Sequence, residues 1–169
     1  MEKPVLLISR CLLGENVRYD GVPKPQSPGL EALRQHYTLL PVCPEVEFGM
    51  ATPRPPIILM EYPNGTIRLV RKSDRVELTT PFVEFCCKRL LIPAPFGAIL
   101  KSKSPSCGVA STKTYDPAGN LLHEHGTGFF AATIMELFPD ILIADEHNFE
   151  LVFHPLPHPA KKEAPMRGL

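Results

Sequence analysis

The sequence lacks a long hydrophobic run, and none of its apolar stretches approaches the roughly 20 residues that a transmembrane helix needs. Met1 is followed almost at once by a strand-like run at residues 4–9, so we expect no secretory signal. A strong charge of either sign is also missing, since 18 Lys and Arg balance 18 Asp and Glu. These absences predict a cytoplasmic protein without a membrane partner. They also disfavour attraction of a nucleic acid by overall charge, although a local basic patch is compatible with them.

Cysteines are few, and they do not occur in close pairs of the Cys-x-x-Cys type that structural zinc sites often use. The chain has five, an odd number. Together with the expected absence of a secretory signal, the odd number indicates reduced thiols rather than a disulfide framework. The position of each cysteine therefore needs its own explanation.

Apolar runs and amphipathic stretches alternate along the chain, which is typical of an α/β domain with a mostly parallel sheet. The runs predict strands at residues 4–9, 38–42, 96–101 and 141–144. The stretches predict helices at residues 28–37, 79–91 and 129–137. We predict a single Rossmann-like domain over residues 1–153, followed by a C-terminal tail rich in Pro and Lys over residues 154–169.

Turn residues interrupt this alternation in the middle of the chain. An Asn-Gly pair at positions 64 and 65 separates two apolar runs, at residues 57–62 and 67–71, and predicts a small β-hairpin excursion. We expect loop or turn structure at residues 45–56 and 114–120. Residues 149–153 are expected to form an edge strand or a short extension.

Three cysteines share one context, because each follows a predicted strand. Cys11 follows the first strand, Cys43 the second and Cys107 the third. Since the carboxyl ends of parallel strands meet at one edge of a sheet, we expect the three thiols to converge there. Convergent thiols favour a soft metal, either an iron–sulfur cluster with one open iron or zinc completed by a His or Glu.

The remaining two cysteines are adjacent. Cys86 and Cys87 fall in the predicted helix at residues 79–91, where we expect both to be buried and structural. Adjacent side chains on a helix diverge by about 100°, so they are poorly placed to chelate one metal.

The motifs around the three separated cysteines resemble those of the thiouracil desulfurase family, over about residues 4–145. The matching segments are Ser-Arg-Cys-Leu-Leu-Gly at 9–14, Arg-Tyr-Asp-Gly at 18–21, Cys-Pro-Glu at 43–45, Pro-Arg at 53–54, Lys-Ser-Lys-Ser-Pro-Ser-Cys-Gly at 101–108 and Gly-x-Gly at 126–128. Many members carry a further cysteine where this chain has Val17. The resemblance implies a 4Fe–4S cluster on Cys11, Cys43 and Cys107, and removal of sulfur from thiolated pyrimidines, free or in tRNA.

Several polar residues near these motifs are candidates for catalysis or substrate binding. Glu45, two residues after Cys43, is the candidate to activate water or shuttle protons, although a capping or salt-bridged carboxylate explains it as well. Ser104 is a candidate hydrogen-bond donor to substrate or sulfur. We predict four weaker substrate-binding residues, which local loop bonding or a buried Arg–Asp pair explains equally well: Ser102, Ser106, Asp20 and Arg54. Arg18 and Tyr19 could close over the pocket or support the cysteine loops.

The favoured hypothesis is a desulfurase that converts a small 2-thiouracil- or 4-thiouracil-type base to uracil and hydrosulfide by hydrolysis, without net redox change. Two alternatives stay open. One is a tRNA thiouridine desulfurase that uses the same site, which the zero net charge disfavours. The other is a non-catalytic metal-binding or sulfur-carrier module, in which Glu45 completes the metal site.

Overall fold

The computed structural model describes residues 2–153, so the predicted tail at residues 154–169 lies outside the described chain. A first sheet contains four parallel strands in the order β2-β1-β5-β8. These strands are β1 (Val5–Ser9), β2 (Thr38–Val42), β5 (Gly97–Ile99) and β8 (Leu142–Ala144). The predicted α/β class and its parallel sheet are confirmed.

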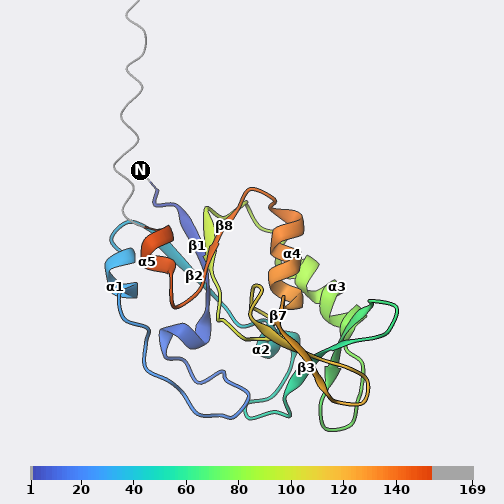
Figure 1. Ribbon diagram of the computed structural model, residues 1–169. Coiled ribbons are helices and arrows are strands. Elements are labelled where there is room, and N and C mark those ends of the chain that lie inside the picture. Colours follow the sequence, from blue (N-terminus) through green and yellow to red (C-terminus); the bar gives the residue numbers. More distant parts are fainter. Residues whose placement is uncertain (1, 154–169) are drawn as a thin grey trace, which may run out of the picture.

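Helices cover both faces of this sheet, as Figure 1 shows. The side chains of β1 alternate between the two faces, because successive residues of a strand point in opposite directions. Leu6 and Ile8 join a core with α1 (Leu30–Leu33) and α5 (Phe149–Val152). Leu7 joins the opposite core with α3 (Thr79–Arg89) and α4 (Phe129–Leu137). β1 is thus buried on both sides, as its continuous apolar sequence predicts.

The predicted hairpin is confirmed, but it belongs to a second four-stranded sheet, with the order β4-β3-β6-β7. Its strands are β3 (Ile57–Glu61), β4 (Ile67–Arg71), β6 (Thr112–Tyr115) and β7 (Leu121–Gly126). β3 pairs antiparallel with β4 and parallel with β6, and β6 pairs antiparallel with β7. The turn expected at residues 114–120 connects β6 and β7. The sequence predicted neither strand. β7 carries little hydrophobic pattern, because it is a mostly exposed edge strand of Leu, His and Glu.

Three short helices differ from the sequence prediction. α1 covers only Leu30–Leu33, because Gly29 at its N-terminus has a left-handed φ of 86° and delays the helix. α2 (Pro44–Phe48) forms where a loop was expected, with Pro44 in its first turn and Gly49 at its end. α5 replaces the expected edge strand or extension, since Phe149 and Phe153 lie one turn apart and both enter the core. Within residues 2–153 no helix is long and apolar enough to cross a membrane.

The fold brings the loops after β1, β2 and β5 to the same edge of the parallel sheet. β1 continues directly into the 3-10 helix η1 (Arg10–Leu13), and β2 leads through Cys43 into α2. β5 leads into the Ser-rich loop at residues 101–108. This shared edge is where open parallel sheets place their ligands.

Candidate active site

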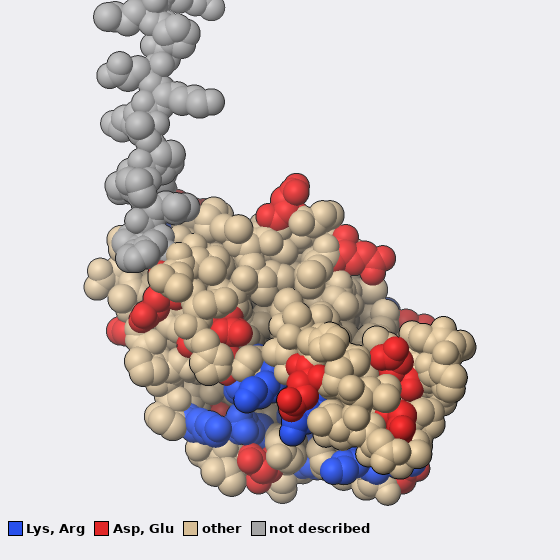
Figure 2. All heavy atoms as spheres, in the orientation of Figure 1, with Lys and Arg blue, Asp and Glu red and all other residues tan. Residues whose placement is uncertain are grey.

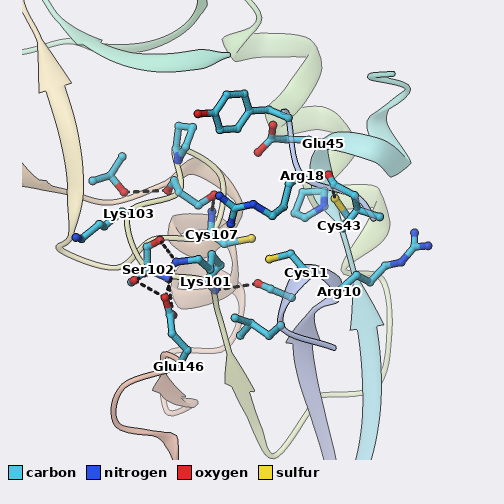
Figure 3. A pocket seen from close by; sticks show the side chains of 18 of the residues that line it. Arg10, Cys11, Arg18, Cys43, Glu45, Lys101, Ser102, Lys103, Cys107 and Glu146 are labelled. Atoms are coloured by element: carbon cyan, nitrogen blue, oxygen red, sulfur yellow. Dashed lines mark hydrogen bonds and ion pairs between the residues drawn. The ribbon is translucent and has the colours of Figure 1, made fainter. Parts of the chain in front are cut away.

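Cys11, Cys43 and Cys107 all line one cavity of about 1350 Å³. Cys11 lies in η1, Cys43 immediately precedes α2, and Cys107 lies in the loop after β5. Figure 3 shows their sulfur atoms facing this cavity. The convergence follows from the parallel order of the three strands, as the sequence predicts.

All three thiols are free, and burial keeps them protonated in the absence of a bound cation. Burial raises the pKa of Cys11 to about 11, while the charges of Lys101 and Arg18 act in the opposite direction. Burial also raises the pKa of Cys43, and that of Cys107 well above its usual value. Because the thiolate is the metal-binding form, a positively charged metal group would have to compensate this desolvation.

The donor set fits an iron–sulfur cluster better than a single ion. One zinc ion in a structural site needs four donors at about 2.0–2.3 Å. A cluster instead offers several irons, each of which takes one cysteine thiolate. Three soft sulfur donors facing one cavity therefore suit a cluster.

Glu45 lies in the same cavity, on α2, and its carboxylate is held at both oxygens. Arg54 Nε donates to Glu45 Oε1 over 3.0 Å, and Ser106 Oγ donates to Oε2 over 3.0 Å. The side chains of Glu45 and Arg54 are only 14% and 5% exposed. Glu45 is thus a fixed negative charge beside Cys43, with a lone pair on each oxygen still able to accept a proton.

Arg54, which was predicted to bind substrate, lines the cavity, and its guanidinium also contacts several groups of the protein. Besides Glu45, it donates to the carbonyl of Val17 over 2.8 Å and to that of Ala51 over 3.1 Å. A further contact reaches Thr52 Oγ1 at 3.3 Å. We therefore interpret Arg54 as a positioning residue that holds Glu45 on one side and the loop containing Val17 on the other.

The predicted serines are placed differently from one another. Ser106 is completely buried and reaches the cavity only through its hydrogen bond to Glu45. Ser104 lines the cavity, and its Oγ accepts the backbone N–H groups of Ser106 and Cys107 over 3.2 and 3.0 Å. This turn shapes the loop that carries Cys107 and leaves the hydroxyl proton of Ser104 available to a ligand.

Asp20, also predicted to bind substrate, is exposed and lies outside the cavity lining. Its carboxylate accepts a hydrogen bond from the N–H of Val22.

The Gly-x-Gly motif before α4 supports the Cys107 loop. A Cβ at Gly128 would collide with the backbone of Ser106 and Cys107. The N–H of Gly128 donates to the carbonyl of Gly108 over 2.7 Å, and that of Phe130 donates to the carbonyl of Ser106 over 2.9 Å. The motif thus lets the start of α4 pack directly against the loop.

Glu146 lines the same cavity, although the sequence motifs did not mark it as a site residue. Its carboxylate accepts hydrogen bonds from Lys101 Nζ, from Ser102 Oγ over 2.6 Å and from the N–H of Ser102 over 2.9 Å. Ser102, a predicted substrate-binding residue, is therefore engaged by Glu146. The signal was available, since Glu146 follows the last parallel strand at the edge where the cysteine loops lie.

Glu146 should also make stability depend on pH. Burial tends to raise its pKa, but the hydrogen bonds from Lys101 and Ser102 outweigh it and lower the pKa from 4.5 to about 2. Because the folded-state pKa is depressed, the stabilisation is complete above about pH 4.5 and is lost as the pH falls through about 2. Glu146→Gln should reduce the free energy of unfolding at pH 7 by about 1–2 kcal/mol, after allowance for solvent screening.

Urea unfolding of the wild type and Glu146→Gln, measured from pH 7 down to pH 3, checks this prediction. The difference between the two proteins should shrink towards low pH. The exposed Glu136→Gln on α4 serves as the control and should show no such trend. A difference that stays constant over the whole range would contradict the prediction.

The adjacent cysteines on α3 only partly match their prediction. Cys86 is fully buried in the core, as expected, but Cys87 is exposed, because one residue rotates a helix by about 100°. Neither lines the cavity.

The double variant Cys86→Ala and Cys87→Ala should lose about 1 kcal/mol of stability and keep its full iron content. Iron analysis after anaerobic purification checks this, and loss of iron from a folded double variant would show that one of them is a ligand.

Basic residues gather around the cavity, although the chain as a whole is neutral. Figure 2 shows Lys and Arg side chains grouped in the lower half of the molecule. Those that line the cavity are Arg10, Arg18, Lys24, Arg54, Lys72, Lys101, Lys103 and Lys113, against the acidic Glu45, Glu124 and Glu146. A local basic patch, which the neutral net charge did not exclude, is therefore present. It favours an anionic or electron-rich ligand.

Comparisons with known proteins agree with this site. The family model described as 2-thiouracil desulfurase matches residues 6–146. Among solved structures, the chain is similar to the 4Fe-4S-dependent thiouracil desulfidase TudS, with a TM-score of 0.65 and 30% sequence identity over 90% of this chain and 95% of that one. No curated protein matches the chain. The match over nearly the whole described chain confirms the resemblance seen in the sequence motifs, and the chain belongs to the 2-thiouracil desulfurase family.

Proposed function

We propose that this protein removes sulfur from a thiolated pyrimidine of the 2-thiouracil or 4-thiouracil type, and that Cys11, Cys43 and Cys107 hold a 4Fe–4S cluster for this reaction. The observation that carries the proposal is the convergence of three free thiols on one cavity. Membership of the 2-thiouracil desulfurase family supports the substrate class. The 4Fe-4S dependence of the similar solved enzyme supports the cofactor.

The proposed reaction is a hydrolysis without net electron transfer. A cluster bound by three thiolates supplies a Lewis-acidic site for a soft sulfur donor. Water forms a new C–O bond at the ring carbon, the C–S bond breaks, and the products are uracil and hydrosulfide. Glu45 accepts the proton of the attacking water, because its carboxylate lies in the cavity beside Cys43 and is fixed by Arg54 and Ser106. A general base placed in this way contributes about 10²–10⁴-fold to the rate.

The non-catalytic alternative, in which Glu45 closes the metal site, is disfavoured by the contacts of that residue. Both carboxylate oxygens already accept a hydrogen bond, one from Arg54 and one from Ser106. A carboxylate that ligates a metal would have to give up or share these bonds. Glu45 is therefore better placed to act on water than to serve as the fourth ligand of a metal.

Thiolated tRNA is a second candidate substrate, because the basic lining of the cavity offers contacts to phosphate groups. The neutral net charge of the chain adds no overall attraction for a polyanion. We therefore keep the small thiolated base as the leading substrate and the tRNA as the alternative.

Anaerobic purification followed by parallel assays tests the proposal. We expect a brown protein with about four irons per chain that releases sulfide from free 2-thiouracil or 4-thiouracil. Faster release from thiolated tRNA than from the free bases would instead favour the second candidate. A fully loaded protein that releases no sulfide from any of these substrates would contradict the proposal.

A further inference from the structure

The guanidinium of Arg18 stands out in the cavity because it lacks a hydrogen-bond partner. Its Nε is buried and makes no hydrogen bond among residues 2–153, and the side chain is only 19% exposed. Asp20 Oδ1 forms an ion pair with Nε over 3.8 Å, which is beyond hydrogen-bond distance. Arg18 belongs to the Arg-Tyr-Asp-Gly motif, to which the proposed reaction assigns no role so far.

Three other basic residues of the cavity lining donate hydrogen bonds to carboxylates, whereas Arg18 has only its longer ion pair with Asp20. Arg10 donates to Glu15 over 2.6 Å, Arg54 donates to Glu45, and Lys101 donates to Glu146. A buried polar group without a hydrogen-bond partner is costly, and each one in a folded protein calls for an explanation. The exception at Arg18 therefore points to an acceptor that a ligand supplies.

The backbone around Arg18 is fixed, so the side chain is presented from a defined position. Arg54 Nη2 donates to the carbonyl of Val17 over 2.8 Å, and the N–H of Arg54 donates to the carbonyl of Tyr19 over 2.8 Å. These bonds anchor the residues on both sides of Arg18. Since Arg54 also holds Glu45, the same side chain fixes both the carboxylate of Glu45 and the backbone that carries Arg18. Figure 3 shows the Arg18 side chain extending across the cavity that Cys11 and Cys107 line.

We infer that Arg18 is a specificity-determining residue that binds the oxygen remaining on the ring of the thiolated pyrimidine. This inference rests on the proposed function. A substrate such as 2-thiouracil carries a soft sulfur and, elsewhere on the ring, a hard carbonyl oxygen. The thiols and their metal group suit the sulfur, whereas the guanidinium offers N–H donors that suit the oxygen. The two recognition points select oxo-thiopyrimidines over thiopyrimidines without the oxygen, because the latter leave Arg18 unpaired.

A comparison of two substrates and two proteins tests the inference. The substrates are 2-thiouracil and pyrimidine-2-thione, which lacks the second oxygen, and the proteins are the wild type and Arg18→Met. We expect the wild type to favour 2-thiouracil by roughly 10- to 100-fold in kcat/KM, as for a charged hydrogen bond. Arg18→Met should lose a similar factor with 2-thiouracil and little with pyrimidine-2-thione, so that the preference disappears.

Equilibrium binding of the product uracil to the cluster-loaded proteins gives a readout that does not depend on turnover. Arg18→Met should bind uracil roughly 10-fold or more weakly than the wild type, while Arg18→Lys, which keeps a charged donor, should recover part of the loss. Arg68→Met is the matched control, since Arg68 pairs with Glu77 outside the cavity. It should behave like the wild type in both measurements.

Two results would overturn the inference while leaving the proposed function intact. One is an equal loss on both substrates in Arg18→Met with full iron content, which would assign Arg18 a structural role. The other is unchanged kinetics and uracil binding. If Arg18→Met fails to fold, the kcat/KM values of the wild type for the two substrates still test the inference. Equal values would exclude recognition of the ring oxygen. Absence of sulfide release by loaded wild type would instead reject the proposed function.

Discussion

Replacement of any one of Cys11, Cys43 and Cys107 by Ser is expected to remove most of the bound iron and to abolish sulfide release. Each thiol is the only cysteine on its loop, so no neighbouring thiol can take over a lost ligand. A Ser hydroxyl is a harder and far less acidic donor than a thiol, and it binds iron–sulfur clusters poorly. Iron per chain, visible absorbance and sulfide release, measured side by side without oxygen, check this prediction.

Cys87→Ser is the matched control, because Cys87 is exposed on α3 and outside the cavity. It should keep both iron and activity at the wild-type level. Far-UV circular dichroism separates loss of the cluster from loss of the fold. A folded Cys11, Cys43 or Cys107 variant with full iron and full activity would show that the altered residue is not a ligand.

The second large effect is expected for Glu45→Gln, which should keep the cluster but lower turnover by at least about 100-fold, or ~3 kcal/mol of transition-state stabilisation. Gln can preserve the local contacts: its oxygen accepts from Arg54 Nε, and its amide donates to Ser106 Oγ once that hydroxyl rotates. The change therefore removes the proton acceptor with little disturbance of its surroundings.

Iron content and single-turnover rates of the wild type, Glu45→Gln and the exposed control Glu84→Gln decide between catalyst and ligand. Full iron with a large loss of rate assigns Glu45 to proton transfer. Iron lost in proportion to activity would move Glu45 to the metal, as in the closed-site alternative. Full iron with near wild-type turnover would exclude Glu45 from the mechanism.

The sequence was sufficient to predict the convergence of the three thiols on one cavity. Continuous apolar runs such as residues 4–9 mark buried parallel strands, and a cysteine after each of three strands must reach the same sheet edge. Helix periodicity was enough for α3 and α4, but apolar residues lie on the stripes of both Cys86 and Cys87, so the pattern did not show which of the two cysteines is exposed. β7 was missed because exposed edge strands carry little hydrophobic pattern.

Side-chain partners were much harder to predict than the position of the site. The Glu45 carboxylate is held by hydrogen bonds from Arg54, nine residues away, and from Ser106, 61 residues away. No local pattern encodes such pairs, since they arise only when loops from different strands meet. For the same reason Arg54 and Ser106 were predicted to contact substrate, whereas the structure places both on the carboxylate of Glu45.

Hydrolytic desulfuration without net redox change, as we propose it, can be followed through the fate of a labelled oxygen. Anaerobic, cluster-loaded protein would be incubated with 2-thiouracil in water enriched in a heavy oxygen isotope, with no reductant added. We expect each uracil formed to gain one labelled oxygen, and one sulfide to be released per uracil over many turnovers. Uracil without the label, or turnover that stops unless an electron donor is supplied, would contradict the proposed hydrolysis.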